Sequence, residues 1–260
     1  MSRWRLVPAA ALVGLSAIVA LRSSAPSHLE LESAWASPSA AHPLGCGEAG
    51  VDLLALVSHA TLRGVALAAA VGVVGMLVGA PLGAGAALAR GRLERAVARA
   101  CDLVQSIPTF LLALSVLSAV RAPTRVHLAV VFMLTAWAPF ARLALAEGRV
   151  LRAASFVEAA RALGATRAAV LAKHVLPNTV GVVAVQLGAT AAAVVVSEAA
   201  LAFVGFGVQG GVSLGGVLDQ GVASMLRAPH VLLVGAGAVF ATSTSLMVAG
   251  RALDGHHARR

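Results

Sequence analysis

The chain has 260 residues, of which 59% are hydrophobic and only 12% are charged, and its mean hydropathy is +0.88. A soluble domain carries about 25% charged residues and needs polar side chains over its outer shell. This composition excludes an ordinary soluble enzyme. It also excludes a disordered chain, which would be poor in apolar residues. What it predicts is a polytopic membrane protein of the all-α class.

The net charge of +9 comes from 20 Lys and Arg residues against 11 Asp and Glu residues. In a membrane protein such an excess is typical of loops retained in the cytoplasm, so nucleic acid is not an expected partner. Lys173, the sole lysine, lies between Ala172 and His174 and cannot belong to a G-x-x-x-x-G-K-[ST] phosphate loop. We therefore expect neither ATP hydrolysis nor a cofactor in this chain. Cys46 and Cys101 are expected on opposite sides of the bilayer, where they cannot pair.

Uncharged runs predict about six membrane spans, because a helix needs roughly 20 apolar residues to cross a bilayer core of about 30 Å. The runs are Leu6–Leu21, Gly64–Ala89, Leu103–Val120, Val126–Ala141, Val175–Ser197 and Ala228–Gly250. The fourth is expected to continue past Arg142. The stretch Ala199–Leu218 is interpreted as the end of the fifth span followed by an external loop, because its glycines disfavour continuous helix.

The distribution of basic residues predicts the orientation. With the N-terminus inside, fifteen of the twenty Lys and Arg residues fall in cytoplasmic segments, which follows the positive-inside rule and places both termini in the cytoplasm. The five outside are Arg22, Arg63, Arg121, Arg125 and Arg227. A cleaved signal peptide is the rival interpretation of the first span, since Arg3 and Arg5 precede a short apolar run. Cleavage would leave the other five spans oriented as before.

These spans divide the chain into four parts. They are a cytoplasmic tail with the first span (1–27), an extracytoplasmic segment (28–59), a transmembrane domain (60–254) and a cytoplasmic tail (255–260). Within the second span Gly75, Gly79 and Gly83 recur every four residues. This small-xxx-small ridge predicts a helix-packing seam, because it allows close approach of another backbone.

The segment 149–178, RVLRAASFVEAARALGATRAAVLAKHVLPN, is too polar to cross a membrane but is rich in helix formers. It predicts two helices joined by a turn at Gly164, with Thr166 capping the second helix and Pro177 ending it. Glu158 and Arg161 are spaced to pair. The alanines Ala159, Ala160 and Ala162 would form a smooth surface, beside the apolar side chains of Phe156, Leu163 and Leu171. We interpret this hairpin as a docking element for a partner on the cytoplasmic face.

The residues Glu158–Ala165 (EAARALGA), followed by His174–Asn178 (HVLPN), resemble the EAA loop of permease subunits in ATP-binding-cassette importers. Three further segments resemble the second permease of dipeptide, oligopeptide and nickel importers. They are His42–Gly45 (HPLG), Ser197–Gln209 (SEAALAFVGFGVQ) and Gly250–Asp254 (GRALD). The segment Cys46–Asp52 departs from the family pattern, because the usual Asp and Arg are absent from it.

This resemblance implies a type I importer permease fold in the bacterial cytoplasmic (inner) membrane. It implies a sister permease, two cytoplasmic ATPase subunits and an extracytoplasmic substrate-binding protein as partners, within the lipid bilayer. The ATPase-coupling role would fall on Glu158, Ala159, Ala160, Arg161, Leu163, Gly164 and Pro177. The expected solute is a short peptide, with nickel or another small solute as the alternative. A self-contained channel or secondary carrier is the alternative from another class.

Glu198 lies at or inside the fifth span, where a carboxylate is costly and usually faces a partner or water. One interpretation makes it a gate or a residue of the translocation path. The other makes it an interfacial carboxylate bonded to a neighbouring helix or to the sister subunit. The sequence leaves both open.

Overall fold

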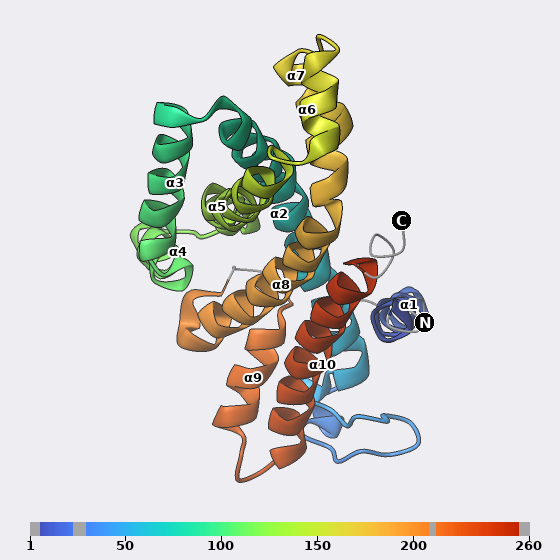
Figure 1. Cartoon of the computed structure of the whole chain (residues 1–260). Helices are drawn as coiled ribbons and strands as arrows, with labels where there is room; N and C mark the ends of the chain where they lie inside the picture. The colour runs from blue at the N-terminus through green and yellow to red at the C-terminus, as the bar shows by residue number, and fades with distance from the viewer. Residues whose placement is uncertain (1–5, 23–29, 208–211, 255–260) are drawn as a thin grey trace.

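The computed structural model describes residues 6–22, 30–207 and 212–254, which form helices and turns with one isolated β-bridge between Cys46 and Asp52 (Figure 1). The all-α class is therefore confirmed. The α-helices are α1 (Val7–Arg22), α2 (Leu53–Ala89), α3 (Gly91–Ser106), α4 (Thr109–Ala119), α5 (Arg125–Leu151), α6 (Ser155–Ala162), α7 (Arg167–Val170), α8 (Leu176–Leu201), α9 (Leu214–Ala223) and α10 (Pro229–Asp254). Two π-helical turns, η4 (Leu171–Val175) and η5 (Ala202–Phe206), flank α8, and two 3-10 turns, η2 (Leu31–Ser33) and η3 (Glu48–Gly50), precede α2.

Four helices of the described chain are long and apolar enough to cross a bilayer. They are Leu53–Ala89, Arg125–Leu151, Arg167–Phe206 and Pro229–Ala252. They contain the second, fourth and fifth expected spans and all of the sixth except Ala228, and α5 continues past Arg142 as the sequence predicts. The apolar stretch of α1, Val7–Leu21, is shorter.

The expected third span, Leu103–Val120, is wrong as one continuous helix. The chain bends by 66° between α3 and α4. Pro108 explains the break, because proline has no N–H to donate and biases the preceding residue away from helical backbone. Ile107 accordingly adopts φ −95° and ψ 118°. The two helices together form a bent pair that is a fifth candidate span or a re-entrant loop.

The stretch Ala199–Leu218 is only partly as expected. Helix continues through η5 to Phe206, and Gly205 has φ +88°, which an L side chain would strain. A new helix, α9, then begins where a loop was expected. The Oγ of Ser213 accepts a hydrogen bond from the backbone N–H of Gly216 at 3.1 Å, which caps the start of α9.

The centre of the bundle is the packing of α2 against α5. Gly75, Gly79 and Gly83 lie on the side of α2 that faces α5. A Cβ atom at Gly75 would lie 2.8 Å from the carbonyl oxygen of Ala136, and Cβ atoms at Gly79 and Gly83 would collide with the backbone of Trp137 and Ala141. The two helix backbones are therefore too close for any side chain at these three positions.

The residues before α2 fold back onto the end of the bundle where α9 turns into α10 (Figure 1). Trp35 and Leu44 pack against a buried apolar cluster that includes Leu53, Val217 and Val231. The Nδ1 of His42 lies 2.8 Å from the Oδ2 of Asp52, whose Oδ1 accepts the N–H of Ala55 at 3.0 Å and caps α2. The HPLG residues thus attach this segment to the start of α2.

Cys46 lies inside this folded segment and is fully buried. Removal of water raises the pKa of its thiol, and the nearby carboxylates of Asp52 and Glu30 raise it further. Cys46 and Cys101 are both free thiols. A buried thiol with a raised pKa is a poor nucleophile, so Cys46 serves as packing.

Candidate functional site

The segment 149–178 forms a hairpin of α6 and α7 that projects from one end of the bundle, opposite the turn between α9 and α10 (Figure 1). Its turn is a Schellman motif: the N–H of Ala165 donates to the carbonyl of Ala160 and the N–H of Gly164 donates to that of Arg161, both at 3.0 Å. Gly164 has φ +87°, so the turn needs glycine. The Oγ1 of Thr166 accepts the N–H of Ala169 at 3.2 Å and caps α7 as expected.

Pro177 does not end the second helix of the hairpin, and that expectation is wrong. The chain passes from α7 through the π turn η4 into α8 without leaving helical structure. The N–H of Leu176 donates to the carbonyl of Leu171, five residues back. A π turn widens the helix by one residue, and Pro177 then falls in the first turn of α8, where a missing N–H is tolerated.

The exposed surface of the hairpin combines apolar and small side chains. Leu163 is 89% exposed and Phe156 is 44% exposed, while Val157 and Val170 are buried against the bundle. Glu158 and Ala159 are also exposed. Two expectations are corrected here. Leu171 packs partly buried against the bundle core, and within the described residues Glu158 forms no ion pair with Arg161.

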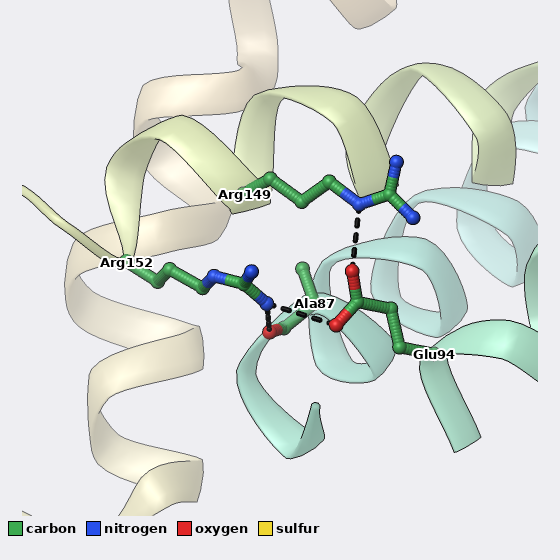
Figure 2. Close-up of polar contacts among 4 residues, drawn as sticks. All are labelled: Ala87, Glu94, Arg149 and Arg152. Atoms are coloured by element: carbon green, nitrogen blue, oxygen red, sulfur yellow. Dashed lines mark hydrogen bonds and ion pairs between the residues drawn. The ribbon is translucent and has the colours of Figure 1, made fainter. Parts of the chain in front are cut away.

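A cluster of four residues, Ala87, Glu94, Arg149 and Arg152, fixes the base of the hairpin (Figure 2). Glu94 accepts two hydrogen bonds, from the Nε of Arg149 at 2.7 Å and from the Nη1 of Arg152 at 2.9 Å. The same Nη1 donates to the carbonyl oxygen of Ala87 at 2.8 Å, near the C-terminus of α2, where carbonyls lack helical partners. We call this the Glu94 cluster. It joins α2, α3 and α5 directly before α6 begins.

A cavity of about 360 Å³ lies among α2, α5, α8 and the break between α3 and α4. Pro108 lines it at the break before α4, and Pro139 lines it from α5. Six uncharged polar side chains line it among apolar ones: Gln105, Thr109, Thr135, Gln186, Thr190 and Ser197. No Asp, Glu, Lys, Arg or His is among the lining residues that the structure describes. The volume falls in the range of about 300–1,000 Å³ that is typical of small-molecule sites.

Glu198 follows Ser197 but is not among the residues that line this cavity, and it lines a small separate pocket instead. It shares that pocket with Arg125 and Ser213. Gly64 on α2 faces it, and a Cβ atom there would lie 3.3 Å from the Oε2 of Glu198. The guanidinium of Arg125 donates instead to the carbonyl of Val212, at 3.1 Å.

The Glu94 cluster and the two cavity glutamines were not among the predicted site residues. Glu94 and Arg152 are 58 positions apart, and no sequence pattern links them. Gln105 and Gln186 do carry a signal, since a polar amide within an apolar run usually faces a cavity or another helix. The hairpin also packs directly on α2, the helix that carries the glycine ridge, because Val157 and Val170 share a buried cluster with Ala84.

Comparison with known proteins identifies the class of protein. A family model described as binding-protein-dependent transport system inner membrane component matches residues 79–256, which include the whole hairpin. The chain belongs to this family. The resemblance seen in the sequence is thereby confirmed.

Curated members of this family align with most of the chain. The glutathione transport system permease protein GsiD of Pectobacterium atrosepticum is 30% identical over 221 residues, which is 83% of this chain and 72% of the relative. The protein of the same name from Shigella dysenteriae serotype 1 is 32% identical over 223 residues, covering 83% of this chain and 71% of the relative. That of Escherichia coli O157:H7 is 31% identical over 223 residues, with the same coverage.

As a member of the binding-protein-dependent permease family, the chain is a multi-pass inner-membrane subunit of an ATP-binding-cassette importer. Such a subunit is not an enzyme, and it works with ATPase and substrate-binding partners. Helices α2, α5, α8 and α10 are long and apolar enough to be membrane spans of such a subunit.

Proposed function

We propose that this permease, together with a sister permease, forms the translocation path of an importer for short peptides. We further propose that the hairpin of residues 149–178 couples this path to two cytoplasmic ATPase subunits. An extracytoplasmic binding protein would deliver the peptide at the end of the bundle formed by residues 30–52 and the turn between α9 and α10. Both chain termini would then lie in the cytoplasm, which the excess of basic residues on that side supports.

One observation carries the coupling proposal. The second arm of the hairpin and the span behind it form a continuous helix, Arg167–Phe206, of 40 residues. At 1.5 Å per residue this helix is about 60 Å long. It begins in the hairpin and supplies Gln186, Thr190 and Ser197 to the cavity wall. A displacement of the hairpin would therefore reach the cavity wall along one helix, through the π turn η4 that joins α7 to α8.

The surface of the hairpin supports docking to a partner protein. Leu163 and Phe156 offer exposed apolar side chains beside the small Ala159, and exposed apolar groups on a polar cytoplasmic segment favour a protein contact. The same surface includes further residues of α6, namely Glu158, Ala160 and Arg161. Gly164 forms the turn that follows them. Pro177 lies where the hairpin joins the span, next to the π turn, a helix irregularity that often marks a hinge or functional site.

The peptide assignment is supported by the name of the relatives, which are glutathione transport permeases. Glutathione is a tripeptide, and the cavity volume is sufficient for a ligand of that size. Nickel or another small solute is the alternative within the same architecture. A self-contained channel or carrier has less support, because the family is one of binding-protein-dependent systems.

For Glu198 we propose a gating role beside the path. It follows Ser197 of the cavity wall on the helix that the hairpin would move, and it faces the backbone of α2 at Gly64. A carboxylate at this depth needs water or a partner group, and both change when helices move.

Reconstitution tests the proposed function. The permease would be purified with its co-purifying partners, placed in proteoliposomes with the binding protein, and assayed for uptake of glutathione, trialanine and Ni²⁺. We expect ATP-dependent accumulation of a peptide that requires the binding protein. Accumulation of Ni²⁺ without accumulation of either peptide would identify nickel, and not a peptide, as the substrate. Uptake by this chain without an ATPase would contradict the importer proposal.

A further inference from the structure

The cavity among α2, α5 and α8 contains hydrogen-bonding groups that the protein leaves free. The Nε2 of Gln186 donates to the Oγ1 of Thr190 at 3.1 Å, which uses one of its two N–H groups and leaves its carbonyl oxygen open. Among the described residues, Gln105 makes no side-chain hydrogen bond at all. Gln105 is exposed and Gln186 is half-buried, and both line the cavity, so both are open to a molecule inside it.

Gln186 lies on a membrane-span helix and Gln105 on the bent pair that is a fifth candidate span, where lipid cannot satisfy a side-chain amide. An unpaired amide in hydrocarbon costs several kcal/mol, so polar side chains in spans face protein, water or a transported solute. The break in the helix at Ile107 and Pro108 also indicates a water-filled cavity, because irregular backbone within a membrane is tolerated where it lines one. Gln105 and Pro108 are exposed in this subunit, so the cavity opens on the side of the break.

The lining also has a definite chemical character. A primary amide offers one donor group and one acceptor group side by side, which match the C=O and N–H of a peptide bond. The Thr109 hydroxyl donates to the Thr135 hydroxyl at 3.4 Å, which donates to the carbonyl of Phe132 at 3.1 Å, so these two hydroxyls add acceptors to the cavity wall. No charged side chain of the described residues faces the cavity, so the charges of a peptide would find no partner there.

We propose that this cavity is a contact site for the backbone of the peptide in transit, with Gln105 and Gln186 as the residues that hydrogen-bond its amide groups. The inference rests on the peptide function proposed above. The site would bind amide groups rather than side-chain charge, and it would bind them weakly. Weak, uncharged contacts suit a path, because a solute must leave a transport site as well as enter it.

Cysteine labelling tests the site. Gln105→Cys, Gln186→Cys and the control Leu134→Cys would be made in a variant with Cys46→Ala and Cys101→Ala. Leu134 lies on α5, is 64% exposed and does not line the cavity. The complete transporter in proteoliposomes, with its binding protein, is treated with a water-soluble methanethiosulfonate. The peptide is trialanine or S-methylglutathione, neither of which has a free thiol.

We expect both cavity cysteines to react, and saturating peptide to slow their reaction several-fold. Leu134→Cys, on a membrane span and outside the cavity, should stay unlabelled with or without peptide. Cavity cysteines that do not react, or that react equally with and without peptide in vesicles that accumulate the peptide, would overturn the inference. If wild-type vesicles accumulate neither peptide, the proposed peptide function fails and the inference falls with it.

A charge-introducing variant gives an independent measurement. Gln186→Glu places a carboxylate in a cavity that has no other charge, so we expect uptake of a lysine-containing tripeptide to rise relative to trialanine. Gln186→Leu should raise the KM for both peptides while the assembled complex is recovered in normal amount. Unchanged KM values and an unchanged preference in both variants would contradict the assignment of Gln186.

Discussion

Glu94 on α3 and Arg152, the residue after α5, are joined by a hydrogen bond of 2.9 Å. Arg152 immediately precedes the hairpin, and α3 leads directly to the break at Pro108 that lines the cavity. The side chain of Glu94 is only 13% exposed, so this contact is better shielded from solvent than a surface ion pair. The base of the hairpin and one wall of the cavity thus share an anchor.

Glu94→Gln tests this anchor. The amide keeps the shape of the carboxylate but loses the charge and one acceptor oxygen, and a hydrogen bond to a charged group is worth about 1.5–3 kcal/mol. Because Arg149 is partly solvated, we expect a loss near the lower end of this range. Amide hydrogen exchange should become faster in α6 and in the first turns of α3. Glu147→Gln on α5, which removes a carboxylate without a partner among the described residues, should leave exchange unchanged. Equal exchange in the two variants would contradict the conclusion that Glu94 stabilises the base of the hairpin.

The α2–α5 contact predicts opposite outcomes for two glycines of one helix. At Gly79 a methyl group would collide with the backbone of Trp137, whereas at Gly85 it would lie 3.7 Å from the Cδ2 of Leu171, an ordinary contact. Gly79→Ala should therefore destabilise the subunit by about 1–3 kcal/mol, as overpacking does. Gly85→Ala should be neutral or stabilising by up to about 1 kcal/mol. Thermal unfolding in detergent, with the yield of monodisperse protein, distinguishes them. Two equally stable variants would show that the helices are not this close.

The buried thiol of Cys46 should resist alkylation. Its pKa is raised by burial and by neighbouring carboxylates, so the reactive thiolate forms only at higher pH than for a free cysteine. We expect N-ethylmaleimide to leave Cys46 unmodified in the folded protein at neutral pH and to modify it after denaturation. Peptide mass spectrometry measures both states. Rapid modification of the folded protein would show that residues 30–52 do not pack over this thiol.

Glu198→Gln tests the proposed gating role of this carboxylate against the interfacial alternative. For a gate beside the path, we expect uptake to fall while the complex with its partners assembles in normal amount. For an interfacial carboxylate, assembly itself would fall, which co-purification of the partner subunits would reveal. Normal uptake together with normal assembly would exclude both roles.

The sequence predicted features that depend on local chemistry. The apolar runs of α2, α5, α8 and α10, the turn at Gly164 and the cap at Thr166 follow from hydropathy, glycine and a hydroxyl at fixed positions. The sequence-based predictions were wrong where the effect of a proline depends on the surrounding structure. Pro177 is accommodated by a π turn, so the helix does not end, whereas Pro108 does break a span that hydropathy alone makes continuous.

Long-range contacts could not be predicted from one sequence. The pairing of Glu94 with Arg149 and Arg152 depends on how α3 turns back along α5, and the cavity depends on the 66° bend between α3 and α4. Neither leaves a periodic signal. The glycine ridge predicted that α2 packs closely on another helix but did not indicate which one. The structure shows that this helix is α5.

The most direct test of the coupling proposal is the number of peptide molecules transported per ATP hydrolysed by Gly164→Val in the reconstituted transporter. Gly164 has φ +87° and open space around it, so valine introduces backbone strain without a collision. Left-handed backbone costs an L residue about 1–2 kcal/mol, and roughly 1–2 kcal/mol changes a two-state equilibrium about 5- to 30-fold. The matched control is Gly237→Val on α10, where the space is also open and φ is not positive.

We predict that Gly164→Val lowers the transport-to-hydrolysis ratio several-fold while ATP hydrolysis continues, and that Gly237→Val leaves the ratio unchanged. An unchanged ratio in Gly164→Val, with the complex intact, would contradict the proposal that the hairpin couples the ATPase to the translocation path.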